Sequence, residues 1–312
     1  MSVLSAPHFH NEEAAYAYVE SKLWPNGPVC PHCGGYERIG KLQGKSTRIG
    51  AYKCYQCRKP FTVKVGTIFE ASHVPMRFWL QAFYLYCASK KGFSANQLHR
   101  TLGVTLKTAW FMAHRVREAM RDDEQLPLGG PGVVVEVDET FIGRPEETFV
   151  NGKGWVKKRG TETKRRVISL VERGGRARSI HVDKLDAATI RKALFENIVL
   201  ASRLHTDEAH HYRIPGREFE AHERVNHSKE EYACGDVTTN TVEGFFSIFK
   251  RGMRGIYQHC GEKHLHRYLC EYDFRYSHRV ALGIDDKARA DHLLQGVVGK
   301  RLTYRTTAGQ AA

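Results

Sequence analysis

The chain of 312 residues is long enough for two or three domains with a sizeable core. With 41% hydrophobic and 26% charged residues, its composition is that of an ordinary soluble globular protein. Lysine and arginine number 48 against 34 acidic residues, a net charge of +14, which favours a phosphate-rich partner such as nucleic acid; a basic enzyme without such a partner is the alternative.

Two further features bear on where the protein works. No apolar run approaches the roughly 20 residues that span a bilayer, and the N-terminal segment lacks the charged and apolar regions of a signal peptide. We therefore expect a cytoplasmic protein. Eight cysteines in that compartment indicate metal binding rather than a disulfide framework.

Residues 1–72 are expected to form an N-terminal helix followed by a zinc ribbon. Apolar residues at helical spacing predict a helix over 11–23, which ends before Pro25. Two Cys-X-X-Cys pairs follow, separated by twenty residues. Four thiolates held as two tight pairs suit a closed, tetrahedral, structural zinc site, whose ligands are Cys30, Cys33, Cys54 and Cys57.

Residues 73–125 are predicted to be helical and to contain a helix-turn-helix. The segment SANQLHRTLGVTLKTAWFMAHRVREAM predicts two helices that are joined at Gly103, with Thr105 capping the second helix. An apolar stripe on the second helix would pack inward. We expect its other face to be exposed, basic and in contact with DNA through Lys107, His114, Arg115 and Arg117. An ordinary helical hairpin is the alternative.

A polar segment rich in glycine and proline, DDEQLPLGGPG, indicates a domain boundary before residue 126. The runs VVVEVDET, VISLVE, RARSIHV and SRLHTDEA predict four strands, with a helix over DAATIRKALFENIV and a fifth strand near HERVNHS. This order predicts an α/β domain built on one mixed sheet over 126–285. A basic tail is expected over 286–312.

Two aspartates end predicted strands of this domain. Asp138 and Asp207 follow apolar runs, and strand ends at the edge of an α/β sheet are where active sites form. Glu139 and Glu208 come directly after them. Side chains alternate along a strand, so we expect these two glutamates to face the opposite side and to matter less.

A third acid lies in the segment TNTVEGFFSIFKRG, which predicts a helix. Its apolar residues form one stripe that docks the helix into a core. Glu243 and Lys250 share a different face, together with Asn240. Three separated acids can hold a pair of Mg²⁺ ions roughly 3.5–4 Å apart for phosphodiester chemistry, and Lys250 would meet a nearby phosphate.

The motifs VDET, HTDEA and NTVEGFFSIFKRG, in this order, resemble those of DDE-type transposases of bacterial insertion sequences. The resemblance is to the zinc-ribbon group related to Merlin elements, and it runs from about Glu12 to Arg279. It implies a ribonuclease-H-like catalytic fold and DNA strand cleavage and transfer that depend on Mg²⁺ or Mn²⁺. It also implies binding to terminal inverted repeats and to target DNA, as a homo-oligomer.

The resemblance assigns the first two metal-binding acids to Asp138 and Asp207 and the third to Glu243. Asn240 is a rival for the third position; we expect Glu243 to bind the metal and Asn240 to support it. Thr238 and Ser277 stand where the family pattern often has His and Asn. These departures leave every acid in place and make the activity of this copy, rather than its fold, the open question.

A basic loop between the first two predicted strands, NGKGWVKKRGTETKRR, is a second candidate DNA contact, with Trp155 available for stacking. A solvated run of charge is the alternative. The candidate residues are Lys153, Lys157, Lys158, Arg159, Lys164, Arg165 and Arg166, together with Arg251 on the glutamate helix.

Two other functions fit part of the same sequence. A non-catalytic DNA-binding regulator would need the zinc ribbon and the helix-turn-helix, but it would not need three separated acids. A ribonuclease-H-like nuclease, such as a junction resolvase, would use the same metal chemistry without joining strands.

Overall fold

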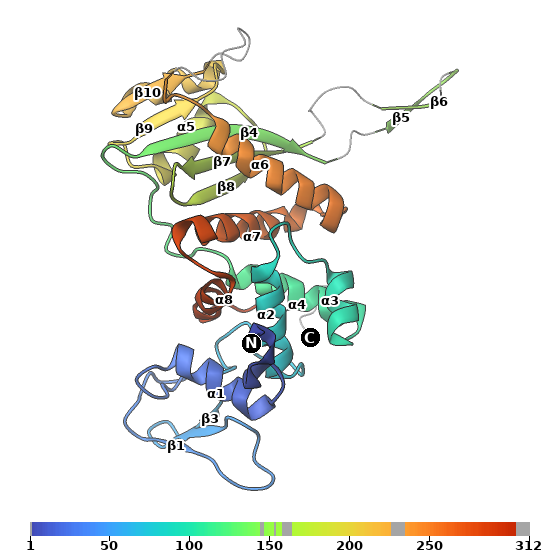
Figure 1. Ribbon diagram of the computed structural model, residues 1–312, viewed down its shortest axis with the longest axis vertical. Coiled ribbons are helices and arrows are strands. Elements are labelled where there is room, and N and C mark those ends of the chain that lie inside the picture. The colour runs from blue at the N-terminus through green and yellow to red at the C-terminus, as the bar shows by residue number, and fades with distance from the viewer. Residues whose placement is uncertain (1, 144–146, 153, 158–163, 226–234, 304–312) are drawn as a thin grey trace. The chain divides into compact units, whose positions relative to one another are not determined.

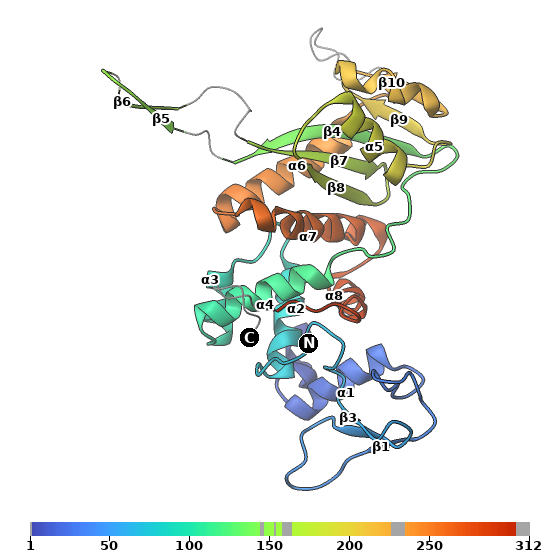
Figure 2. The same cartoon turned by 180° about the vertical axis from the view of Figure 1, so that it is seen from behind.

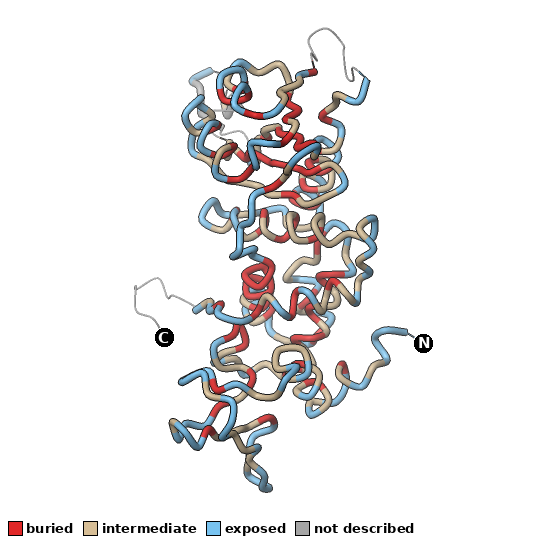
Figure 3. Tube along the Cα trace, turned by 90° about the vertical axis from the view of Figure 1, so that its left-hand side faces the viewer, coloured by how far each residue is buried: buried red, intermediate tan, exposed pale blue. Residues whose placement is uncertain are grey.

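The computed structural model describes residues 2–143, 147–152, 154–157, 164–225 and 235–303 (Figure 1). They form two compact units, of which the first comprises residues 1–121 with 279–312 and the second residues 122–278. Buried stretches lie inside both units, with exposed segments at turns (Figure 3). No helix within these described ranges is long and apolar enough to cross a membrane.

The first unit begins with a helix and a small sheet. Helix α1, Glu12–Leu23, starts where the Asn11 side chain accepts a hydrogen bond from the Ala14 amide. The sheet that follows is antiparallel and three-stranded, in the order β1 (Ile39–Lys41), β2 (Tyr52–Cys54) and β3 (Pro60–Phe61).

The other helices of the first unit are α2 (Met76–Ala88), α3 (Ala95–Leu102), α4 (Leu106–Ala119) and α8 (Asp286–Gln295). Helix α2 buries most of its side chains, as its continuous apolar sequence predicts. Residues 286–295 were expected in a basic tail but form α8. The Asp291 carboxylate ties α8 to α1, since it accepts a hydrogen bond from Tyr18 and pairs with Lys22 at 2.7 Å.

Helices α3 and α4 have the local geometry of the predicted pair. Gly103 adopts φ +66°, a left-handed conformation that ends α3, and the Thr105 hydroxyl caps α4 by accepting from the Thr108 amide. The expected apolar residues of both helices are buried. The predicted turn and its inward-facing stripe are therefore present.

The basic face predicted for α4 was wrong. Only Lys107 is exposed, whereas His114, Arg115 and Arg117 are buried. The Arg115 guanidinium donates to the main-chain carbonyls of Ile68 and Glu70 at 2.6 and 3.0 Å. These buried side chains stabilise the first unit, and they do not form a surface that faces a DNA groove.

The second unit is built on a mixed five-stranded sheet in the order β10-β9-β4-β7-β8. Strand β7 is antiparallel to both of its neighbours, β4 and β8, whereas β9 and β10 run parallel to β4. The strands are β4 (Val134–Ile142), β7 (Arg165–Glu172), β8 (Ala177–Val182), β9 (Arg203–Thr206) and β10 (Ala221–Arg224). The five strands that the sequence predicts are all present.

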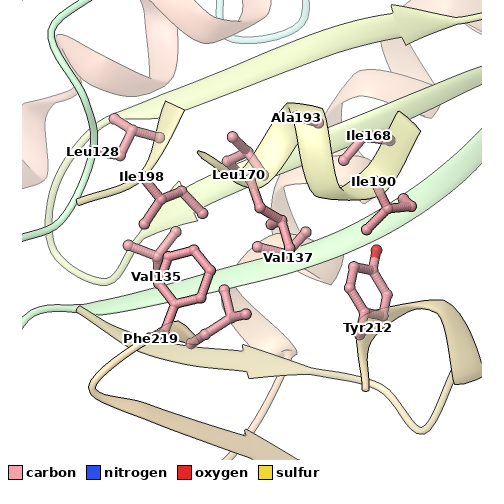
Figure 4. Packing of buried hydrophobic residues seen from close by; sticks show 12 residues of the cluster. Leu128, Val135, Val137, Ile168, Leu170, Ile190, Ala193, Ile198, Tyr212 and Phe219 are labelled. Atoms are coloured by element: carbon pink, nitrogen blue, oxygen red, sulfur yellow. The ribbon is translucent and has the colours of Figure 1, made fainter. Parts of the chain in front are cut away.

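Helices cover both faces of this sheet (Figures 1 and 2). Helix α5, Ala187–Asn197, packs on one face, where Ile190 and Ile198 meet Val135, Val137 and Leu170 of the sheet (Figure 4). The other face carries α6 (Asn240–Gly252) and α7 (Leu265–Ser277). The side chains of α6 that pack there are Val242, Phe245, Phe246 and Phe249, as its sequence predicts.

A separate two-stranded antiparallel hairpin, β5 (Glu147–Val150) with β6 (Gly154–Lys157), lies where the sequence indicates only a basic loop. Lys153, Lys158 and Arg159 of that loop lie outside the described residues, as do the side chains of Trp155 and Lys157. Nothing in the described chain bears on their predicted contact with DNA.

The buried role of Arg115 can be tested by replacing it with methionine, which keeps most of the side-chain length. We expect Arg115→Met to lower the free energy of unfolding of the first unit by roughly 1–3 kcal/mol, because buried carbonyls lose their donor. Chemical denaturation followed by tryptophan fluorescence measures the change. The exposed control Lys107→Met should change it by less than about 0.5 kcal/mol. Equal stability of both variants would contradict the assignment.

Candidate active site

Four cysteines of the first unit lie together at one end of its small sheet. Their sulfur atoms all lie within 4.8 Å of one another, with Cys30 Sγ 3.6 Å from Cys57 Sγ and Cys33 Sγ 3.7 Å from Cys54 Sγ. A tetrahedron with Zn–S bonds near 2.3 Å has edges of about 3.8 Å. The observed distances fit that shape.

Main-chain turns position the thiols of each cysteine pair. In the first turn, Gly34 adopts φ +73° and its amide donates to the Cys30 carbonyl at 2.9 Å. The Cys57 main-chain amide lowers the pKa of the Cys54 thiol to about 7, which favours the thiolate that binds metal. All ligand positions are taken by cysteine, so a bound Zn²⁺ here is structural.

We expect the intact protein to contain one Zn²⁺ per chain and the Cys54→Ser variant to contain almost none, because the site needs four thiolates. Elemental analysis after dialysis measures the metal, and circular dichroism follows the loss of the ribbon. Cys260→Ser, which replaces a half-buried cysteine outside the cluster, should keep its zinc. Zinc retained by Cys54→Ser would show that the cluster is not the binding site.

The first aspartate lies on the face of the sheet that α6 covers. Asp138 of β4 stands opposite Ser169 of β7 in the strand register, and paired residues share a face. Val167 and Val171 of the same face pack against α6 and α7. Glu139 faces the other side, where its carboxylate meets the Tyr212 hydroxyl and the His211 ring at 2.5 and 2.6 Å. This alternation is as predicted.

The second aspartate follows β9, the strand that runs parallel to β4. The Asp207 carboxylate accepts a hydrogen bond from the Ala209 amide at 2.9 Å, which holds the turn after the strand. Burial raises the pKa of Asp207. The prediction that Asp138 ends a strand was wrong, because β4 continues to Ile142. The parallel pairing of Glu136 with His205 nevertheless brings Asp207, directly after β9, next to the part of β4 that carries Asp138.

The third acid is presented by the first turn of α6. Glu243 is exposed, and its carboxylate accepts a hydrogen bond from the buried Thr239 hydroxyl at 3.0 Å. Asn240 is also exposed. Lys250 is half-buried two turns further along the helix, with its ammonium group 5.6 Å from the centre of the Phe246 ring.

The second and third acids lie near enough to act on Asp138. Burial, together with the charges of Glu139, Asp207 and Glu243, raises the pKa of Asp138 to about 7. Among the described residues, only the four cysteines bring three or more ligand atoms within 4.8 Å of one another. The charges of Asp207 and Glu243 thus act on the carboxyl group of Asp138, and the hard oxygens of the three acids suit divalent cations.

The remaining basic candidates differ in exposure. Arg165 is half-buried and donates to the Cys260 carbonyl, while Arg166 donates to the Asp183 carbonyl at 2.8 Å. Lys164 is half-buried. Arg251 is exposed and donates to the Ser247 carbonyl at 3.1 Å.

Comparisons with known proteins agree on one family. Residues 10–60 match a transposase zinc-ribbon domain, and residues 127–277 match an ISXO2-like transposase domain. The chain is also 32% identical over 256 residues to an uncharacterized protein in transposable element ISH50 of Halobacterium salinarum, an alignment that covers 78% of this chain and 83% of that protein. The chain belongs to the IS1595 family of DDE transposases with a zinc ribbon.

A solved structure adds a weak likeness to this transposase. It is the intasome of simian T-cell lymphotropic virus in complex with PP2A regulatory subunit B56 gamma. The match has a TM-score of 0.29 and 13% identity, and it covers 56% of this chain and 63% of that chain, less than two thirds. At this score the likeness carries no argument.

A buried carboxylate that was not singled out in the sequence joins the strand with Asp138 to the helix with Glu243 in this transposase. Glu136 of β4 is fully buried and lies on the same face as Asp138. It accepts hydrogen bonds from the amides of Thr241 and Val242 at 2.7 and 3.0 Å and from the Thr241 hydroxyl at 2.8 Å. The strand with the first aspartate thus caps the helix with the glutamate.

Arg173, from the turn after β7, balances this buried charge. Its guanidinium donates to the Glu136 carboxylate from Nε at 3.0 Å and from Nη2 at 2.7 Å. It also donates to the main-chain carbonyls of Asp236 and Thr238, which precede α6. The alternation Glu-Val-Asp in β4 was the sequence signal for a second acid on the active face.

The raised pKa of Asp138 predicts that, without added Mg²⁺ or Mn²⁺, this side chain destabilises the transposase at high pH. The pKa of about 7 in the folded state exceeds the value of 3.8 in the unfolded state, so the folded state binds this proton more tightly. The contribution of the Asp138 carboxyl group to stability is therefore fully present below pH 3.8 and is lost as pH rises through 7. Asp138→Asn should therefore raise the Tm at pH 8 by several degrees, and the difference should shrink toward pH 5. Differential scanning calorimetry measures both values, and an equal difference at both pH values would refute the coupling.

Proposed function

We propose that this transposase binds the inverted repeats at the ends of its element, cleaves DNA there and joins the freed strand to target DNA. The effect of Asp207 and Glu243 on Asp138 carries the proposal, because the charges of two acids from distant segments help to raise the pKa of this buried aspartate. Neighbouring carboxylates of this kind bind divalent cations, which neutralise their charge and catalyse phosphodiester chemistry.

The catalytic unit is proposed to have a ribonuclease-H-like fold. Support comes from the mixed sheet, in which β4 carries the first aspartate between antiparallel β7 and parallel β9. Helices on both faces and the placement of the second aspartate directly after β9 agree with this assignment.

Asp138, Asp207 and Glu243 would hold Mg²⁺ or Mn²⁺. The chemistry supplied by the bound cations is activation of a water or a 3′-hydroxyl and stabilisation of the leaving oxygen. The Thr239 hydroxyl orients the Glu243 carboxylate. Lys250 lies two turns from Glu243 on the same helix, where its ammonium group would bind a DNA phosphate. Asn240 at the start of α6 supports Glu243 and is the alternative third ligand.

A strand-transfer assay on DNA that carries the element ends tests the proposal. Asp138→Asn, Asp207→Asn and Glu243→Gln should each lower the rate of joined product by roughly a thousandfold, since each removes several kcal/mol of metal-dependent stabilisation. Glu196→Gln, an exposed carboxylate on α5, is the matched control and should keep full activity.

Different outcomes separate the alternatives. Cleavage without joined product would indicate a nuclease, whereas tight DNA binding without cleavage by the unaltered protein would indicate a regulator. Full activity of Glu243→Gln combined with loss of activity in Asn240→Ala would assign the third ligand to Asn240. Full activity of Asp138→Asn would overturn the enzyme proposal itself.

A further inference from the structure

A pocket of about 640 Å³ in the second unit lies beyond the C-terminal end of α6. Its wall includes the end of β4, the start of β7 and the segment after α6, and it is lined by Arg165, Lys250 and Arg254, with the His259 ring beside them. None of the described residues that line it is acidic. A hollow whose described lining has three permanent positive charges and no carboxylate suits an anion.

Two of these cations lack an anionic partner in the described chain. Lys250 contacts the Phe246 ring and Arg254 is exposed, and neither forms a salt bridge with a described carboxylate. Arg165 is held in place by its hydrogen bond to the Cys260 carbonyl. The apolar side chains of Phe141, Ile142 and Met253 also line the pocket. A ligand that combines phosphate charge with a less polar sugar fits this mixture.

The backbone on one side of the pocket has an uncommon conformation. Met253–Tyr257 forms a π-helical turn directly after α6, and such turns occur often at functional sites. The next residue, Gln258, has φ +56°, which is strained for a residue with a β-carbon. The Tyr257 hydroxyl donates to the buried Glu271 carboxylate of α7, and this bond anchors the turn. The turn thus presents Arg254 from a fixed position.

We propose that this pocket binds the phosphodiester backbone of the DNA strand about three nucleotides from the bond that is cut. The distance follows from α6, because Lys250 lies seven residues, or roughly 10 Å, beyond Glu243 along the helix axis. A DNA strand rises roughly 3.4 Å per nucleotide. The inference rests on the proposed function, since it places the cut at the three acids, and it adds Arg254 and Arg165 as the residues that fix the position of the strand.

The first test measures DNA affinity against salt concentration for the full chain in an Asp138→Asn background without Mg²⁺. Adding Arg254→Gln should lower the affinity roughly three- to tenfold and reduce the slope of log affinity against log salt by about 0.9, the loss of one phosphate contact. Arg191→Gln replaces an exposed arginine of α5 on the opposite face and should leave the slope unchanged. Equal Tm values would show that the variants fold.

The second test replaces single phosphates of the element end by neutral methylphosphonates. Replacing the one linkage near the third nucleotide from the cut should weaken DNA binding by the protein that retains Arg254. The same replacement should not lower the DNA affinity of Arg254→Gln any further. An unchanged salt slope, or equal effects of every linkage in both proteins, would overturn the inference while leaving the proposed function standing. Arg254-dependent binding of inorganic phosphate with an unchanged DNA slope would assign the pocket to a small anion instead. A chain that binds no element-end DNA would overturn both proposals.

Discussion

The bond network around Glu136 is the constraint on which the site depends. A buried carboxylate in β4 accepts hydrogen bonds from the first amides of α6 and from the Arg173 guanidinium. An uncompensated buried charge costs about 3–5 kcal/mol. Burial of Glu136 in β4 therefore requires both the first turn of α6 and Arg173 to be in place. The position of Glu243 relative to Asp138 is therefore set by the core rather than by the acids themselves.

This arrangement explains how the second unit can hold acids that repel one another. Burial and the neighbouring charges raise the pKa of Asp138, which is a local cost, while the helix that bears Glu243 is held by its aromatic stripe and by Glu136. The packing of α6 thereby keeps Glu243 close to Asp138, where cations are proposed to bind, in spite of the repulsion between their charges. Positive charge collects beyond it, where Lys250 and Arg254 line one pocket. One helix thus separates an acidic region from a basic one by two turns.

Much of this could be read from local patterns. Cysteine spacing predicted the ribbon, apolar alternation predicted five strands, and helical periodicity predicted which face of α6 packs inward. The wrong predictions for α4 share a cause. Arg115 and Arg117 were expected on a surface because arginine is usually exposed, but main-chain carbonyls of a distant loop accept from Arg115 and the ring of Tyr86 lies under Arg117. Burial of a charge depends on partners that a helical pattern does not contain.

The sequence by itself determined the five strands of the large sheet, most helices, the zinc ligands and the candidate acids, because spacing along the chain is enough to specify a turn, a strand or a helix face. It did not determine α8 or the β5–β6 hairpin. The tertiary structure decided which of those side chains meet. Strand order places β9 beside β4 although some sixty residues separate them, and it turns Glu136 toward α6. It also places Arg165 in the same pocket as Arg254. Such meetings depend on register and on the packing of distant segments, which no short stretch of sequence encodes.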